Sequence, residues 1–215
     1  KVTYLLKRAT QHIKTGDNKS VIADMEEVLA LNEKEKLNMP DGVLSIVYNL
    51  LASSYGATGD IEKASKYAEL AAKAGSSDLA VYLNLSTVYI KQKRYREAVE
   101  RLKDAEKLDP SNSAIYFNYA MIALAVPDYP LGYAYLQKSR SYRDEELAQG
   151  RAPDIDEVRF YKTLALASMG LKRYGEAEDI LTNLAQSGLD CPDCQKLLAQ
   201  NSALAARAAS PAKKP

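Results

Sequence analysis

The stretch from Tyr82 to Pro110, YLNLSTVYIKQKRYREAVERLKDAEKLDP, decides the fold of this chain. Its apolar residues recur at i, i+3, i+4 and i+7 in two runs, which is the spacing of one face of a helix. The polar segment between the runs, residues 91–94, interrupts the pattern. Two helices joined by so short a break fold back on each other, so the stretch predicts an antiparallel helix pair.

The same unit recurs along the chain. Tyr48, Tyr82 and Tyr116 are spaced 34 residues apart, and each begins a similar pattern of apolar and small residues. A further copy begins at Tyr161, and residues 5–32 form a degenerate first copy in which Arg8 stands where an apolar residue is expected. A repeated unit of this size is typical of solenoids, in which each unit buries its apolar faces against its neighbours.

The period of 34, the large residue three before an apolar one, the small residues that follow and the closing Asp109-Pro110 resemble the tetratricopeptide repeat. The resemblance implies an all-α fold, a right-handed solenoid of about five antiparallel helix pairs plus a C-terminal capping helix. We expect an array over residues 1–190, with copies near 5–32, 45–76, 79–110, 113–145 and 158–190. A capping helix over 191–208 and a tail or linker over 209–215 follow.

Two insertions interrupt the period, near residues 35–42 and near residues 142–155. We expect loops or extended helix ends at both. Long loops on a rigid scaffold can carry function, but a tolerated surface insertion is the simpler interpretation.

Composition excludes several classes of function. Lys and Arg number 29 and Asp and Glu 28, so the formal net charge of +1 makes nucleic acid an unlikely main partner. No apolar run approaches the roughly 20 residues that span a bilayer, so we expect no membrane insertion. The chain begins at Lys1, without an initiator Met, as a processed product or a segment of a longer protein would. We expect a soluble protein of the cytoplasm or the periplasm, and its N-terminal targeting information is absent.

The sequence favours a scaffold and not an enzyme. It contains one His, no glycine-rich phosphate loop and no Ser in a nucleophile setting, so we predict neither catalysis nor a cofactor. The family resemblance implies a protein–protein interaction scaffold that binds a peptide or helical segment of a partner in its concave groove, within a larger complex or alone. The alternatives are a structural or self-assembly module and a regulatory segment of a larger protein.

In this family the first helix of each pair lines the concave face. Carried onto this sequence, that rule predicts a peptide-binding groove formed by Asn49, Leu50, Leu83, Asn84, Thr87, Phe117, Asn118, Met121, Arg159 and Lys162. The same rule also places Ile46, Ser53, Ala80, Ala114, Thr163 and Leu166 on the inward face.

Asn84 and Asn118 occupy equivalent positions and resemble the asparagines with which some members bind the backbone of an extended peptide. An amide can donate and accept at once, so it suits any peptide unit. The alternative is that these amides only satisfy a neighbouring helix or face water. Arg159 and Lys162 could favour an acidic segment, although a solvated face is the favoured interpretation. The residues of the family's chaperone-tail binders are mostly missing here.

Cys191 and Cys194 form a Cys-x-x-Cys pair at the start of the last predicted helix. No strand-helix-strand pattern of a thioredoxin surrounds them, so a simple disulfide or two inert thiols is the favoured interpretation. Two cysteines supply too few ligands for a zinc site, and His12 lies at the other end of the array. We therefore predict no metal site.

Overall fold

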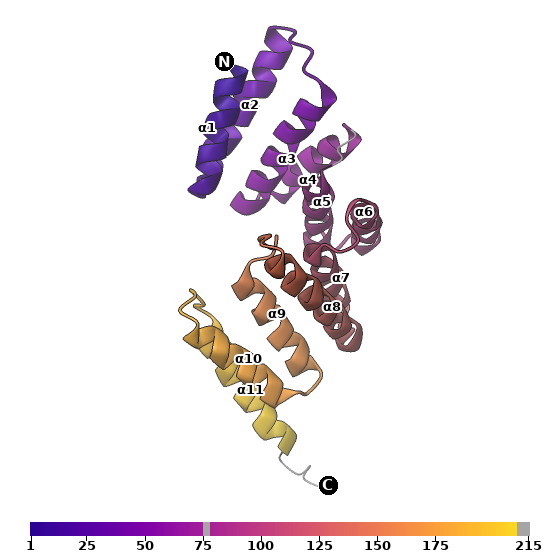
Figure 1. Cartoon of the computed structure of the whole chain (residues 1–215), viewed down its shortest axis with the longest axis vertical. Helices are drawn as coiled ribbons and strands as arrows, with labels where there is room; N and C mark the ends of the chain where they lie inside the picture. Colours follow the sequence, from indigo (N-terminus) through magenta and orange to yellow (C-terminus); the bar gives the residue numbers. More distant parts are fainter. Residues whose placement is uncertain (75–77, 210–215) are drawn as a thin grey trace. The chain divides into compact units, whose positions relative to one another are not determined.

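The computed structural model describes residues 1–74 and 78–209, and in these residues it consists of α-helices joined by turns and short loops, without a strand (Figure 1). This confirms the predicted all-α helical repeat fold. The chain divides into two compact units, residues 1–110 (unit 1) and residues 111–215 (unit 2), and each is described by itself. The expected tail lies outside the described residues, except for Ala209.

Unit 1 contains three helix pairs. Its helices are α1 (Val2–Lys14), α2 (Asn18–Lys34), α3 (Asp41–Thr58), α4 (Ile61–Lys73), α5 (Leu79–Lys91) and α6 (Tyr95–Leu108). Each helix packs on the next, and α3 also contacts α5, as expected where the first helices of neighbouring pairs lie side by side. The core runs through all the pairs and includes Leu5, Met25, Leu51 and Val88.

Unit 2 contains two helix pairs and a terminal helix. Its helices are α7 (Ser113–Ala125), α8 (Tyr129–Ala148), α9 (Glu157–Gly170), α10 (Tyr174–Gln186) and α11 (Cys194–Ala209). Each helix again packs on the next, and α11 packs on α10. Cys194, Leu197, Leu198 and Leu204 of α11 join the core around Leu181. The terminal helix therefore covers apolar surface of the last pair.

Four of the described turns inside the helix pairs share one geometry. In the pairs that begin with α1, α3, α5 and α9, one residue of the turn adopts a positive φ. These residues are Gly16, Gly59, Lys93 and Lys172, with φ of 72°, 92°, 60° and 60°. They lie four residues after His12, Tyr55, Tyr89 and Ser168, respectively. The residue after the positive-φ residue donates its N–H to the carbonyl of the residue five positions earlier, as Asp60 does to Tyr55 at 2.9 Å. This left-handed residue ends the first helix of each of these pairs and reverses the chain.

Short polar side chains begin most of the helices. Asp17, Asp60, Asp78, Asp128 and Asp156 each accept a hydrogen bond from a backbone N–H in the first turn of the following helix. These caps satisfy N–H groups that have no partner within the helix, so they fix where each helix starts.

The first insertion forms a loop, as expected. It contains Lys36 and Asn38 with positive φ, and the N–H of Met39 donates to Oδ1 of Asn32 at 3.1 Å. Pro40 directly precedes α3, where its missing N–H costs no helical hydrogen bond.

Candidate functional site

In unit 1, the predicted groove residues lie on α3 and α5. Nδ2 of Asn84 donates to Oδ1 of Asn49 at 2.9 Å, so the two amides satisfy each other across the inner helices. Leu83 is buried, and Leu50 packs against the core. Thr87 donates its hydroxyl to the carbonyl of Leu83 at 2.9 Å. The surface that these predicted groove residues of α3 and α5 expose is therefore mainly polar.

A shallow cleft of about 180 Å³ lies beside these amides. We call it the unit-1 cleft; it is lined by Ala52, Ser53, Gly56, Ala57, Asn84, Thr87, Val88 and Lys91. Small side chains on α3 form one wall, so a backbone could approach this helix closely. Nζ of Lys91 lies 3.4 Å from the carbonyl oxygen of Gly56, at the edge of the cleft.

In unit 2, the structure buries two of the predicted groove residues. Phe117 is 1% exposed and Asn118 is 6% exposed, so neither lines an open groove. The ring of Phe117 packs 6.1 Å from the ring of Phe160, centroid to centroid. Phe117 belongs to the hydrophobic interior where α7 meets α9, and contact of a partner with Phe117 or Asn118 stays a prediction.

The same region contains a larger, mostly apolar cavity of about 480 Å³. We call it the unit-2 pocket; it is lined by Met121, Leu124, Ala125, Tyr129, Thr163, Leu166, Met169, Gly170, Gln200 and Leu204. The residues come from α7, α9 and α11 and from the start of α8. Its size is within the usual range of ligand sites, and two methionines make its wall adaptable.

The repeat pattern identified part of this pocket. It placed Met121, Thr163 and Leu166 on the inward face, and all three line the cavity. The pattern did not identify Tyr129, which follows the turn between α7 and α8, nor Gln200 and Leu204 on the terminal helix. The 34-residue register does not extend to these positions, so only the packing of α8 and α11 against the inner helices reveals them.

Arg159 and Lys162, the remaining predicted residues, lie on α9 before the pocket. Nζ of Lys162 is 2.8 Å from Oδ2 of Asp193, which directly precedes α11. The hydrogen bond from Lys162 lowers the pKa of Asp193. The guanidinium of Arg159 lies over the ring of Phe117, 5.1 Å from its centroid.

Cys191 and Cys194 form a disulfide. Cys191 lies shortly before α11, and Cys194 is the first residue of that helix. Cys194 is buried in the unit 2 core, and in sequence Asp190 directly precedes Cys191 and Asp193 directly precedes Cys194. Negative neighbours disfavour a thiolate, which a redox-active pair requires. The bond therefore fits a structural role at the start of the terminal helix.

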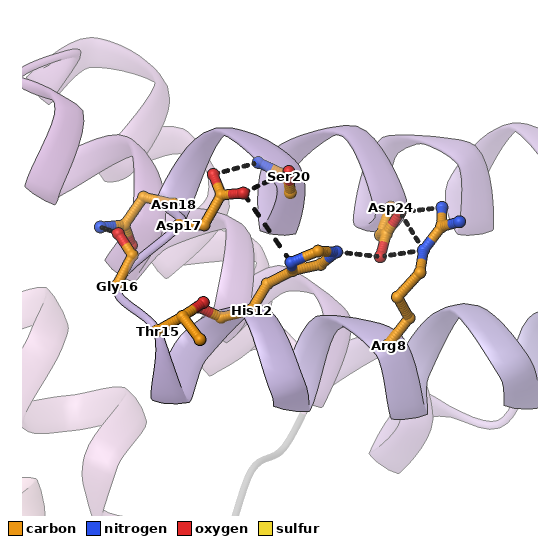
Figure 2. A network of polar contacts seen from close by, with 8 residues as sticks. All are labelled: Arg8, His12, Thr15, Gly16, Asp17, Asn18, Ser20 and Asp24. Atoms are coloured by element: carbon orange, nitrogen blue, oxygen red, sulfur yellow. Dashed lines mark hydrogen bonds and ion pairs between the residues drawn. The ribbon is translucent and has the colours of Figure 1, made fainter.

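A charged cluster in unit 1 was not foreseen by the repeat pattern (Figure 2). Arg8 donates through Nε to both carboxylate oxygens of Asp24, at 3.2 and 3.0 Å, and Asp24 is buried. This hydrogen bonding raises the pKa of Arg8. His12 lies 3.9 Å from Asp24 and 3.8 Å from Asp17. The cluster explains why Arg8 can replace an apolar residue: it neutralises a buried carboxylate of the partner helix.

The second insertion is a structural element and not a dispensable surface loop. It extends α8 to Ala148, and the added turns bury Arg143 and Glu146. Glu146 accepts hydrogen bonds from the backbone N–H and the hydroxyl of Ser113, at 2.9 and 2.6 Å. Arg143 donates to the carbonyl of Ile155 at 2.8 Å. The insertion thus caps α7 and holds the loop that leads to α9.

The part of the chain described by the structure offers no group of three or more His, Cys, Asp and Glu side chains arranged to hold a metal ion. Within the same residues, no helix combines the length and apolar character needed to cross a bilayer.

Comparison with known proteins agrees with this architecture. Residues 46–74 and 79–112 match the tetratricopeptide repeat. A search of curated protein sequences returns no significant match.

Several solved structures share the fold. A thermophilic tetratricopeptide repeat protein of Thermus thermophilus is 17% identical with a TM-score of 0.67, over 95% of this chain and 98% of that one. PilF of Pseudomonas aeruginosa is 17% identical with a TM-score of 0.66, over 96% and 87% of the two chains. MamA of Desulfovibrio magneticus is 13% identical with a TM-score of 0.60, over 86% and 93%.

Identities this low bear on the fold alone, and the match to the repeat covers residues 46–74 and 79–112. Tetratricopeptide repeats generally mediate protein–protein interactions and generally serve as non-catalytic scaffolds. Residues 46–74 and 79–112 of this chain thus match the tetratricopeptide repeat, and its fold is similar to that of a solved tetratricopeptide-repeat protein.

Proposed function

We propose that the chain is a protein-interaction scaffold and that its unit-2 pocket receives an apolar side chain from a peptide or helical segment of a partner. One observation carries the proposal: a largely apolar cavity of about 480 Å³ opens between the inner helices α7 and α9 and the terminal helix. Leu166 in its wall is 42% exposed, so apolar surface remains accessible to a partner.

The unit-1 cleft supports a second, polar contact. The bonded pair of Asn49 and Asn84 retains amide donor and acceptor capacity after its mutual hydrogen bond. Ser53 and Gly56 leave space beside it. We propose that peptide backbone, and not a particular side chain, binds in this cleft.

The experiment is a selection of random displayed peptides on the full chain, followed by affinity measurement with each variant. Leu166→Arg places a charge in the wall of the unit-2 pocket and is expected to abolish binding of most selected peptides. Leu147→Arg is the matched control, because Leu147 is similarly exposed but lies at the end of α8, away from the pocket. Equal binding to wild type and Leu166→Arg would exclude the pocket as the binding site.

The alternative of a self-assembly module makes a different prediction. Light scattering of the full chain would then give a mass that rises with concentration, and Leu166→Arg would return it to that of one chain. A mass of one chain at every concentration removes this alternative.

A further inference from the structure

Three basic side chains lie on α9 and α11 one or two helical turns before residues of the unit-2 pocket wall. Arg159 and Lys162 lie on α9, seven and four residues before Leu166 of the pocket wall, and Lys196 lies four residues before Gln200 on α11. Residues three, four or seven apart on a helix share a face, so these side chains follow the pocket along α9 and α11. We call them the cationic edge.

The acidic groups near this edge are already engaged. Asp193 accepts a hydrogen bond from Lys162 at 2.8 Å. Asp156 caps α9 by accepting the backbone N–H of Arg159 at 2.8 Å. In the described part of the chain, no ion pair joins Arg159 or Lys196 to a carboxylate. Within the edge, Lys162 is paired with Asp193, whereas Arg159 and Lys196 keep positive charge that no described carboxylate pairs with directly.

The guanidinium of Arg159 stacks on an aromatic ring. Its guanidinium lies over the buried ring of Phe117, 5.1 Å from the ring centroid, and the residue is exposed to solvent. The surrounding side chains partly desolvate it, which lowers the pKa of Arg159. A partner carboxylate would restore the lost solvation and could bind in bidentate geometry.

We infer that the partner segment is acidic as well as apolar: it places an Asp or Glu carboxylate at Arg159 and an apolar side chain in the unit-2 pocket. This inference rests on the proposed function, whose site it deepens. Seven residues of α9 separate Arg159 from Leu166, roughly 10 Å along the helix axis. An extended partner spans that distance in about three residues, and a helical partner in about two turns.

The test uses the peptides selected on the full chain, now ranked by composition and measured against Arg159→Glu. We expect the selected peptides to be enriched in Asp or Glu at such a spacing from an apolar residue. Their affinity for Arg159→Glu should fall by about tenfold or more, since a charged hydrogen bond is lost and a repulsion is added. Exchanging the acidic residue of a selected peptide for Lys should restore binding to Arg159→Glu.

Lys103→Glu is the matched control, because it makes the same change in net charge at an exposed position on α6 in unit 1. It should leave affinity within about twofold of wild type, as expected for a screened charge on a solvent-exposed side chain. Binding that Leu166→Arg abolishes but Arg159→Glu leaves unchanged would overturn the acidic partner and keep the pocket. Binding that Leu166→Arg does not affect would overturn the proposed function itself.

Discussion

The ring of Tyr129 lies directly against the backbone of Gly170. A Cβ atom added at Gly170 would be 2.1 Å from Cδ1 of the Tyr129 ring, far inside van der Waals contact. Both residues line the unit-2 pocket, so this contact couples the start of α8 to the end of α9 at the proposed binding site. The position therefore requires glycine for packing, and not for an unusual backbone angle.

Gly170→Ala should displace the Tyr129 ring and destabilise unit 2. Overpacking costs about 1–3 kcal/mol, more than the roughly 1 kcal/mol that Ala gains over Gly within a helix. Urea unfolding measures the difference. Gly175→Ala is the control, since nothing lies within 4 Å of a Cβ at that position, and it should not destabilise. Tyr129→Ala removes the ring that clashes, so the double variant Tyr129→Ala, Gly170→Ala should lose less unfolding free energy than the sum of the losses in the two single variants. A loss equal to that sum would contradict the clash.

Lys93→Gly and Lys172→Gly should each stabilise the protein. Both lysines adopt a φ of 60°, the left-handed conformation that Gly16 and Gly59 adopt in the equivalent turns. A side chain with a Cβ is strained there by about 1 kcal/mol, which slightly exceeds the entropy that glycine adds to the unfolded chain. We expect a net gain of roughly 0.5 kcal/mol each in thermal or urea unfolding. A loss of stability in both variants would show that the lysine side chains contribute more than the backbone strain costs.

Glu146→Ala should destabilise unit 2 by about 2–4 kcal/mol, because it leaves two buried donors of Ser113, its N–H and its hydroxyl, without their carboxylate acceptor. It also removes a negative charge from the N-terminus of α7. Urea unfolding again measures the loss. Glu145→Ala changes a neighbouring exposed carboxylate and should alter stability by less than about 0.5 kcal/mol. If both substitutions changed the free energy of unfolding by similarly small amounts, the second insertion would be a tolerated surface segment and not a structural element.

The attachment of α11 should weaken in acid. The pKa of Asp193 is lowered by its hydrogen bond from Lys162, so the carboxylate contributes stability above the unfolded pKa of about 3.9. That contribution is lost as the pH falls through the lowered, folded pKa. Amide resonances of α11, followed by NMR from neutral to acidic pH, should shift in this range. The shift should be smaller in Asp193→Asn, and Asp179→Asn should behave as wild type.

The sequence alone predicted the helix pairs because their signal is local. A 34-residue spacing of Tyr48, Tyr82 and Tyr116 repeats one pattern of apolar spacing, and helix formation and pairing depend on that spacing within each unit. Arg8 was recognised as an exception to the pattern, but its partner Asp24 was not, because nothing local distinguishes a buried aspartate from one on a solvated helix face.

Only the tertiary structure decided which inward residues remain accessible. Phe117 and Met121 occupy the same predicted face of α7, yet Phe117 is buried against Phe160 while Met121 lines the pocket. The helical period determines the direction of a side chain, whereas burial depends on which atoms of other helices fill the space beyond it. Tyr129, Gly170 and Leu204 meet at the pocket through such packing, which the spacing of residues along the chain does not encode.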